Sequence, residues 1–406
     1  MLAVDTLPVP ALDREDHTWV AERDGMSSRA RTAAASGPYR SAVVPAIAVY
    51  APRLPVDLAA DAEEATAALS RFDSYARAVL GADSPTLDPM SSILLRTEST
   101  CSSQIENLTV GARQLALAEI DQPSSGNARV VVANVRAMEA ALELADQLDE
   151  HAVLTMQAEL LRGQRGWEQH AGRYRDGLVW VGTSALTPRG AAHVAPQPEQ
   201  VPAAMSDLVR FMRRDDLPVL VQTAVAHAQF ETIHPFADGN GRTGRALVHA
   251  LLRAKGVLRS TTAPVSAGLL RDTDGYVDGL TAYRAGDARP IVERFADASR
   301  FAAASGAQLV DDLAAQVDDA RRQLHGLRPQ AAAWRVIPHL VAHPVLNANL
   351  LTTTLGLNQM AAQRALAQLA DAGVLQERTG KQRNRVWQHP GIIEVLDVYS
   401  QQLRRT

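Results

Sequence analysis

The chain has 406 residues, too many for one hydrophobic core, so we expect two or three domains. Hydrophobic residues make up 46% and charged residues 21%, which excludes an intrinsically disordered protein. The formal net charge of -4 excludes a general attraction to nucleic acid, so nucleic-acid binding would need a local basic patch. Because Cys101 is the only cysteine, an intramolecular disulfide and a cysteine-based zinc site are excluded as well.

The sequence carries no recognisable signal for export or membrane insertion. Residues 1–24 include Asp5, Asp13 and Asp16 instead of a basic start followed by an apolar run, so they do not read as a signal peptide. No apolar stretch approaches the length that spans a bilayer. With a single cysteine in addition, we expect a cytoplasmic protein that does not enter a membrane.

In chain order, residues 1–44 come first and are polar and rich in Ala, Ser and Gly, which predicts a flexible N-terminal tail. Residues 45–127 are expected to form an N-terminal helical region. Apolar residues at helical spacing predict two helices in it, over about 61–80 and about 89–120. A turn at 121–126, with Pro, Ser and Gly, closes this region.

Residues 128–304 are expected to form the largest domain, which opens with an apolar helix over about 128–148. Residues 178–196 differ from their surroundings. Leu, Val and Trp, a turn with Thr, Ser, Pro and Gly, and a second short apolar run predict a β-hairpin there. A hairpin inside a helical domain is often a functional loop. The other predicted helices of this domain are 202–213, 218–233, 243–255, 274–283 and 290–304.

Residues 305–329 are predicted to form a connecting helix, and residues 330–406 a separate module. In the module, helices precede a basic two-strand tip, and this is the element order of a winged helix. Residues 359–372 would then be a DNA recognition helix, but the basic tip could equally be solvated or bind protein. The basic residues of the tip are Arg378, Lys381, Arg383 and Arg385. The fold class is thus predicted to be mainly α, with one hairpin and a C-terminal winged helix-turn-helix module.

The segment 234–245, His-Pro-Phe-Ala-Asp-Gly-Asn-Gly-Arg-Thr-Gly-Arg, carries the chemistry. Gly239 and Gly241 allow a sharp turn in which successive N–H groups point into one concavity. The helix predicted to follow adds its positive end to that concavity. Arg242 and Arg245, three residues apart, lie on one helix face and offer two charged forks to phosphate oxygens.

Two further side chains complete this phosphate cradle. Asp238 supplies a hard oxygen for Mg²⁺, which normally accompanies nucleotide phosphates. His234 lies at the entrance of the loop, where a neutral imidazole can accept a proton from an attacking hydroxyl. A metal site formed by His234, Asp238 and His227 is an alternative, although a hydrolytic metal site does not require the Gly-Asn-Gly-Arg that follows.

The segment resembles the signature of the Fic (Fido) family, His-x-Phe-x-(Asp/Glu)-Gly-Asn-Gly-Arg-x-x-Arg, at every defined position. The resemblance implies a Fic core and transfer of AMP from ATP to Thr, Ser or Tyr of a protein, with pyrophosphate leaving. It implies that His234 is the base, Asp238 the Mg²⁺ ligand and Arg245 the ligand of the terminal phosphate. The residues implied to bind ATP are Phe236, Asp238, Gly239, Asn240, Gly241, Arg242, Thr243, Gly244, Arg245 and Tyr276. Of these, Phe236 is expected to anchor the core, and Tyr276 to lie near adenine.

An upstream segment resembles the inhibitory motif of the family, (Ser/Thr)-x-x-x-Glu-(Gly/Asn), in the subclass that carries it N-terminal to the catalytic domain. Its residues here are Ser102, Glu106 and Asn107, expected within the helix over 89–120. The implied role is competition, because Glu106 paired with Arg245 would prevent that arginine from receiving the terminal phosphate of ATP. Taken alone, Glu106 would be an ordinary helix carboxylate.

These patterns predict an autoinhibited protein AMP-transferase that needs ATP and Mg²⁺ and acts on a protein hydroxyl, either of a partner or of the chain itself. Two alternatives stay open. One is an enzyme that removes AMP or moves another phosphate-linked group at the same site. The other is a nucleotide-responsive regulator that binds DNA through residues 330–406. A homodimer is compatible with either interpretation.

Overall fold

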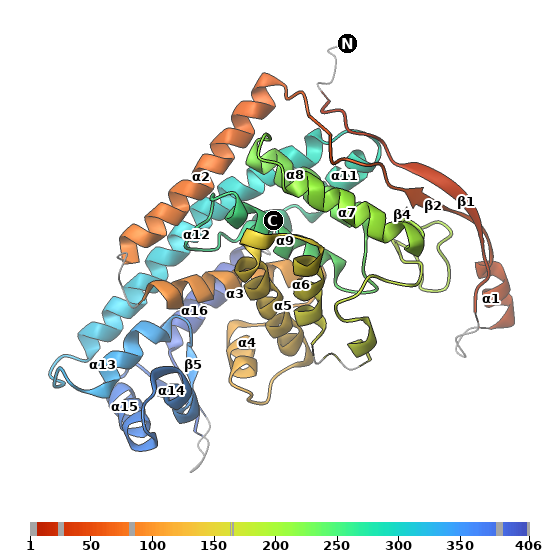
Figure 1. The fold of residues 1–406 in the computed structure, drawn as a ribbon. Helices are drawn as coiled ribbons and strands as arrows, with labels where there is room; N and C mark the ends of the chain where they lie inside the picture. The colour runs from red at the N-terminus through yellow and green to blue at the C-terminus, as the bar shows by residue number, and fades with distance from the viewer. Residues whose placement is uncertain are drawn as a thin grey trace. The chain divides into compact units, whose positions relative to one another are not determined.

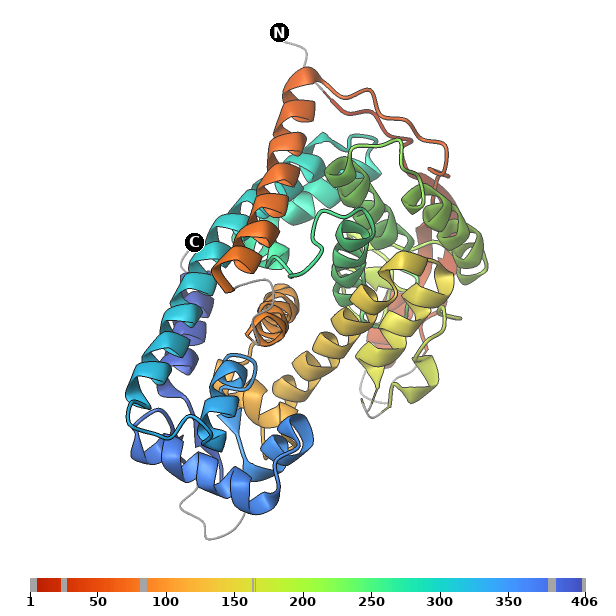
Figure 2. The same ribbon diagram turned by 60° about the vertical axis from the view of Figure 1, so that its left-hand side comes forward.

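The computed structural model describes residues 6–22, 28–80, 86–162, 164, 166–378 and 385–403, and it is mainly helical, as predicted (Figures 1 and 2). The chain forms two compact units, each built from separate stretches of sequence. The first comprises Met1–Thr66, Ala140–Lys255 and Thr273–Ala296; the second comprises Ala67–Glu139, Gly256–Asp272 and Asp297–Thr406. In the part of the chain that the structure describes, no helix combines the length and apolar character required to cross a membrane.

Three helices contribute to both units, namely α2 (Val56–Leu80), α5 (Gly126–Glu143) and α12 (Arg289–Gln323). The first unit also contains β1 (Asp13–Trp19), α1 (Arg29–Ala35), β2 (Gly37–Val43), α6 (Glu150–Leu161), β3 (Trp180–Val181), β4 (His193–Val194), α7 (Val201–Met212), α8 (Val219–Ile233), α9 (Asn240–Ala254) and α11 (Thr273–Arg284). The second also contains α3 (Leu87–Ile105), α4 (Ala112–Glu119), α10 (Val265–Leu270), α13 (Ala332–Val336), β5 (Val345–Leu346), α14 (Ala348–Leu355), α15 (Gln359–Asp371), β6 (Gln376–Glu377), β7 (Trp387–Gln388) and α16 (Pro390–Gln402).

Helix α8 forms the centre of the first unit. Every residue from Leu220 to Ile233 is buried, which is the pattern of a helix enclosed on all sides. Helix α9 packs closely against it because Gly244 has no side chain; a Cβ there would lie 2.9 Å from Cδ1 of Phe230. The C-terminus of α8 and the N-terminus of α9 are joined by residues 234–239, so the central helix pair positions the signature loop.

The flexible tail expected for residues 1–44 is not observed in residues 6–22 and 28–44. Strands β1 and β2 pair as an antiparallel ribbon, from Asp13 opposite Val43 to Trp19 opposite Gly37. The pairing stacks the rings of His17 and Tyr39 with centroids 5.5 Å apart. Cross-strand ring contacts of this kind stabilise a ribbon, but the sequence does not reveal them because it does not show which strands pair.

The single helix expected over 89–120 is two helices. Helix α3 ends at Glu106, and Asn107 adopts the left-handed conformation with φ 62°. The N–H groups of Leu108 and Asn107 donate to the carbonyls of Ser103 and Gln104, which is the Schellman pattern of a helix end. Asn and Gly tolerate a positive φ best, and this explains why an Asn can stand at this position.

The second unit also differs from expectation around its longest helix. The helix expected over 290–304 and the connecting helix expected over 305–329 are one continuous helix, α12, so the domain boundary expected after residue 304 falls inside it. In both views α12 runs beside α2 (Figures 1 and 2). The Tyr75 hydroxyl donates to Asp311 Oδ1 over 2.6 Å.

Three further differences concern other helices. Helices α6 and α10 are not among the predicted elements, and the helix expected over 128–148 ends at Glu143.

The C-terminal residues differ from the predicted order of helices followed by two strands, because β5 precedes α14 and α16 follows β7. Strands β5, β7 and β6 form a three-stranded antiparallel sheet. Lys381 and Arg383 of the predicted tip lie outside the described residues. The expected separation at residue 330 is not seen, because Val345, Val386 and Ile393 share a core cluster with Ala116 of α4. Asp397 of α16 also accepts a hydrogen bond from the Ala112 N–H at the start of α4.

The left-handed Asn107 predicts unequal effects of two substitutions at that position. Asn107→Val should lower the free energy of unfolding by about 1–2 kcal/mol, because a β-branched residue strains there. Asn107→Gly should change it by only a few tenths of a kcal/mol, since glycine accepts positive φ. Urea denaturation followed by circular dichroism measures both, and equal losses for the two variants would contradict the role assigned to φ.

Candidate active site

The loop 234–239 between α8 and α9 turns sharply at both ends. His234 caps α8 in the left-handed conformation with φ 50°, and its N–H donates to the Phe230 carbonyl over 2.8 Å. Gly239 precedes α9 with φ 83°, and a Cβ at that position would lie 2.5 Å from Leu160 Cδ2. Only glycine fits a turn that is both left-handed and this close to a neighbouring side chain.

The Asn240 side chain closes the loop. Its Oδ1 accepts from the Phe236 N–H and its Nδ2 donates to the Phe236 carbonyl, each over 2.8 Å. Phe236 is fully buried, with its ring near those of Phe230 and Tyr174. The Phe236 side chain therefore anchors the loop to the core. Both polar atoms of the Asn240 amide are used within the loop, so its side chain shapes the turn.

The positive groups predicted to hold phosphate lie at the start of α9. Arg242 and Arg245 are each only 3% exposed, and they occupy the first two turns of a 15-residue helix. Asp238 is more open, and its Oδ2 lies 3.2 Å from Arg242 Nη2. The helix N-terminus and the two guanidinium groups favour negative charge at this end of the loop.

At the other end of the loop, His234 is backed by a carboxylate. Its Nδ1 lies 3.6 Å from Oε2 of Glu231, one helical turn earlier on α8. Burial raises the pKa of Glu231, but the neighbouring His234, His227 and Arg245 lower it more strongly, to about 2. Glu231 is therefore ionised, and its carboxylate faces the ring of His234. Glu231 is not among the site residues predicted from the sequence, although its spacing of three residues places it one helical turn from His234.

Tyr276, expected near adenine, lies deep in the first unit. It is 4% exposed, and its hydroxyl is 2.7 Å from His227 Nε2. The contact engages His227 within the core. Among the described stretches of the chain, no group of three or more His, Cys, Asp and Glu side chains could hold a metal ion. The alternative of a site held by His227, His234 and Asp238 therefore has no support in the geometry.

The predicted hairpin is present but short. Trp180 pairs with Val194 and Val181 with His193. The buried His193 ring ties it to α8, because Nε2 lies 2.9 Å from the Thr232 carbonyl. Burial lowers the pKa of His193 to about 3, so the ring is neutral at physiological pH. Helix α6 adds another tie to the loop through Gln157, whose Nε2 donates to the Asp238 carbonyl over 3.4 Å.

The residues of the predicted inhibitory motif lie in the second unit, whereas Arg245 lies in the first. Ser102 is fully buried in the last turn of α3, so it is not a surface hydroxyl. Glu106 is the C-cap residue of that helix, and Asn107 is the left-handed residue that ends it. The motif thus marks the end of a helix, not its middle as expected.

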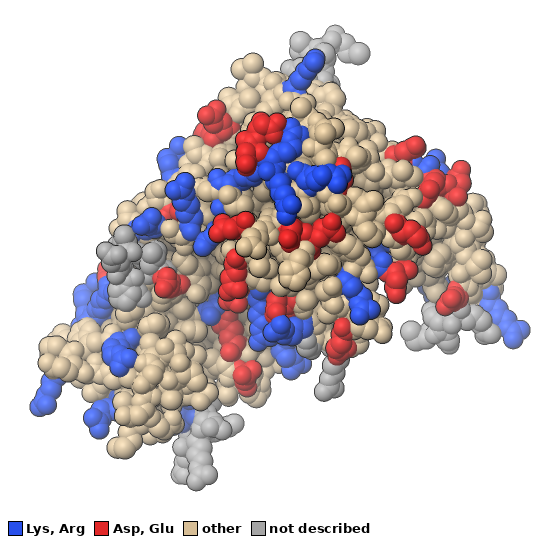
Figure 3. All heavy atoms as spheres, viewed as in Figure 1, with Lys and Arg blue, Asp and Glu red and all other residues tan. Residues whose placement is uncertain are grey.

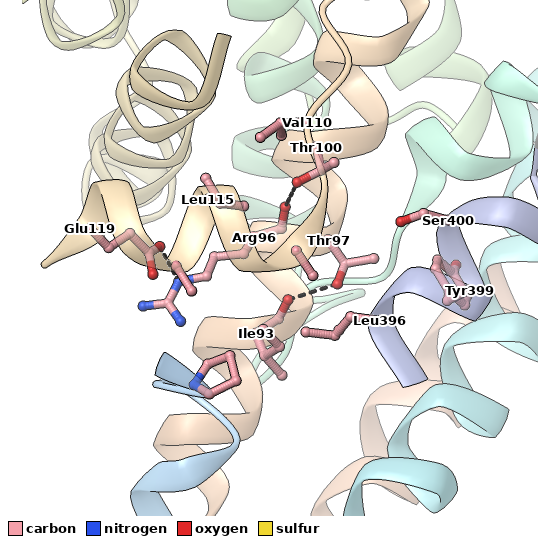
Figure 4. A pocket seen from close by; sticks show the side chains of 13 residues that line it. Ile93, Arg96, Thr97, Thr100, Val110, Leu115, Glu119, Leu396, Tyr399 and Ser400 are labelled. Carbon is pink, nitrogen blue, oxygen red and sulfur yellow. Dashed lines mark hydrogen bonds and ion pairs between the residues drawn. The ribbon is translucent and has the colours of Figure 1, made fainter. Parts of the chain in front are cut away.

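A cavity of about 40 Å³ lies in the second unit among α3, α4 and α16 (Figure 4). An ion pair between Arg96 and Glu119 lines it, with 2.5 Å between Nε and Oε1. Burial raises the pKa of Glu119 to about 7, although Arg96 opposes the rise. The volume suffices for a water molecule or two and not for a nucleotide. The chemistry predicted from the sequence is therefore not located in this cavity.

Comparisons with known proteins agree with the signature. Residues 147–252 match the Fic/DOC family, and residues 59–143 match the N-terminal region of that family. A probable protein adenylyltransferase of Aquifex aeolicus is 40% identical over 70 residues, covering 17% of this chain and 22% of the relative. The protein adenylyltransferase Fic of Nematostella vectensis is 33% identical over 125 residues, which cover 30% of this chain and 26% of the relative. The chain thus spans about a quarter of the length of these relatives.

A solved structure of a Fic family protein from Desulfovibrio desulfuricans G20 aligns with 80% of this chain and 96% of its own. The two are 24% identical, with a TM-score of 0.46.

The buried His193 predicts a pH-dependent contribution to stability. Its pKa in the folded chain is about 3, below the usual histidine pKa of 6.5, so acid favours the unfolded state, in which the ring can be protonated. The stability advantage of wild type over His193→Gln should be complete above pH 6.5. It should then shrink by up to about 1.4 kcal/mol per pH unit as the pH falls from 6 to 4. Thermal melts of both proteins across this range measure it, and a constant difference would contradict it.

Proposed function

We propose that this chain, which matches the Fic/DOC family over residues 147–252 and the N-terminal region of that family over residues 59–143, transfers AMP from ATP to a hydroxyl group of a protein. The observation that carries the proposal is the loop 234–239, which has an imidazole backed by an ionised carboxylate at one end. At its other end are a helix N-terminus and two buried arginines. Such a loop can hold a triphosphate and accept a proton a few residues away.

The reaction divides among these groups. The oxygen of the acceptor hydroxyl attacks the α-phosphorus, and its proton passes to His234. The bond between that phosphorus and the bridging oxygen breaks, and pyrophosphate leaves with the electron pair. Glu231, near Nδ1, leaves Nε2 as the proton acceptor and stabilises the imidazolium that forms. Arg242 and Arg245 bind phosphate oxygens and offset the charge on the leaving group.

Magnesium normally accompanies nucleotide phosphates, and Asp238 is a suitable protein ligand. Its side chain is 36% exposed, more open than the enclosed Arg242 and Arg245. Mg²⁺ commonly takes one or two carboxylates and completes its coordination with phosphate and water, so a single carboxylate fits. When bound, the ion would neutralise phosphate charge. We expect the reaction to occur in the cytoplasm.

We also propose that Glu106 restrains the enzyme by competing for Arg245. A guanidinium has one planar fork, and a carboxylate engaged with it leaves little room for a phosphate. The match of residues 59–143 to the N-terminal region of the family supports this, because Glu106 lies within it. So does the helix end at Glu106, which the Asn107 turn holds in a defined conformation.

An alternative chemistry at the same loop is removal of AMP or transfer of another phosphate-linked group. A different second function, DNA binding by a winged helix over 330–406, has one supporting observation. In the view of Figure 3, the surface over α13, α14 and α15 shows a few basic side chains, which are arginines in these helices, and no Asp or Glu. Against it, Arg385 is engaged with Glu377 and lies over the Trp387 ring. A salt-dependent shift of duplex DNA by the chain tests this second function.

His234→Ala should lower AMP transfer by about 10²–10⁴-fold, the usual effect of losing a general base. ATP affinity should change little, because the phosphate-binding groups are elsewhere in the loop. Incubation with α-labelled ATP and cell lysate, followed by mass spectrometry of labelled protein, measures transfer; calorimetry measures ATP binding. Near-normal labelling by the variant would remove His234 from the role of base. No labelling by wild type or by Glu106→Gly would reject the transferase itself.

Glu106→Gly should raise the rate of self-labelling well above wild type, with little change in ATP affinity. A misplacement of about 1 Å can cost roughly 10²-fold in rate, so freeing Arg245 restores alignment of the α-phosphate. Arg245→Ala should be inactive, and combining it with Glu106→Gly should cancel the gain, because both act through one interaction. Glu64→Gly, an acidic residue of α2, is the matched control. The competition is refuted if folded Glu106→Gly is no faster than wild type.

A further inference from the structure

Arg175 lies between the hairpin and the loop that carries His234. Its side chain makes three hydrogen bonds, all to backbone carbonyls of separate segments. Nε donates to His234 over 2.8 Å, Nη1 to Gly177 over 2.9 Å and Nη2 to Pro196 over 2.6 Å. The Arg175 N–H also donates to the Pro235 carbonyl over 2.9 Å. One residue therefore joins the base-bearing loop to both ends of the hairpin.

A guanidinium buried this deeply needs partners for its donors. Arg175 is 5% exposed, and burial lowers its pKa to about 10, so it remains charged at neutral pH. Burying an ion is unfavourable unless its hydrogen-bonding groups are used. Only arginine offers several donors in a rigid plane, whereas lysine presents one compact charge at the end of a flexible stem. The three carbonyls are thus matched to a guanidinium, not to positive charge alone.

The segments that Arg175 joins have separate tasks in the proposed reaction. Gly177 precedes β3 and Pro196 follows β4, so their carbonyls are the two feet of the hairpin. A target segment paired to the edge of the hairpin would present its hydroxyl according to how those feet are held. The His234 carbonyl belongs to the base. The distance between the acceptor hydroxyl and the base depends on the position of the hairpin and on that of His234, and Arg175 contacts the backbone of each.

We propose that Arg175 is a positioning residue that fixes the hairpin against His234 and thereby sets where the acceptor hydroxyl meets the imidazole. This inference rests on the proposed AMP transfer for its kinetic consequence, but its structural consequence is independent of any activity. We place Arg175 outside the ATP and acceptor sites, because its guanidinium donates to backbone carbonyls. Its substitution should change turnover while leaving nucleotide binding intact.

The hairpin provides a matched control. Arg189, near its tip, also donates to backbone carbonyls, namely those of Ala34 over 2.9 Å and Ser36 over 2.7 Å. These contacts hold the hairpin to the C-terminal end of α1 and not to His234. Arg189→Lys therefore removes the same kind of interaction from the same hairpin at a different place.

The experiment compares Arg175→Lys, Arg175→Gln and Arg189→Lys with wild type in the full chain. Hydrogen–deuterium exchange over 177–196 and 230–236 reports the hairpin and the base loop, including the Ala195 N–H that donates to Val179. Calorimetry gives the ATP dissociation constant, and labelled ATP gives kcat and KM for the protein acceptor. For Arg175→Lys we expect faster exchange in both segments. We also expect a fall in kcat of about 10²-fold and an ATP dissociation constant within about twofold of wild type. Arg175→Gln should behave likewise, and Arg189→Lys should keep wild-type kcat.

The outcomes separate the inference from the proposed function. Suppose that neither wild type nor any variant transfers AMP, but that among the lysine variants only Arg175→Lys speeds exchange in 177–196 and 230–236. AMP transfer is then rejected, and the positioning role stands. If both Arg175 variants match Arg189→Lys in exchange and kcat, the positioning role is wrong. A fall in ATP affinity equal to the fall in kcat would also overturn it, because the residue would then act through the nucleotide site. If both Arg175 variants are unfolded by circular dichroism, the residue is a requirement of folding, and the role is rejected.

Discussion

The two hydrogen bonds between the Asn240 amide and the backbone of Phe236 hold the active-site loop in one conformation. The loop contains Gly239 and leaves a helix through a left-handed residue, so in isolation it would sample many conformations. Closing it across four residues directs the N-terminus of α9 and the C-terminus of α8 toward the same short segment. The proposed phosphate binding and proton transfer would both depend on that closure.

Beneath the loop, the first unit buries charged and polar groups that a core would ordinarily exclude. Glu231 and Arg175 are each 6% exposed or less, and each contacts His234, one through its ring and the other through its carbonyl. Buried ions are weak sources of stability, since desolvation offsets their attraction. The placement of Glu231 and Arg175 matters more than their contribution to stability, because one faces the ring of His234 and the other holds its backbone carbonyl.

The segment that we propose to be inhibitory has an unexpected setting within the second unit. The helix end at Asn107 and the start of α4 belong to the same compact unit as residues 332–403. Asp397 of α16 caps the first turn of α4, five residues after Asn107. The C-terminal residues therefore contact α4 directly, and not through a linker. A change in these residues would alter the surroundings of Glu106 and could thereby affect the proposed inhibition.

The sequence by itself predicted the candidate site, because residues 234–245 form a continuous segment that contains its glycines, arginines and histidine. It also predicted the positions of α7, α8 and α15 closely, since their apolar spacing is a local property. Tertiary structure alone decided the pairing of the ribbon β1–β2, the roles of Arg175 and His193, and the burial of Tyr276. Each depends on partners that are far away in sequence, from Asp13 with Val43 to His193 with Thr232. A local pattern cannot reveal a contact whose other half lies in a distant segment, and folding brings those halves together.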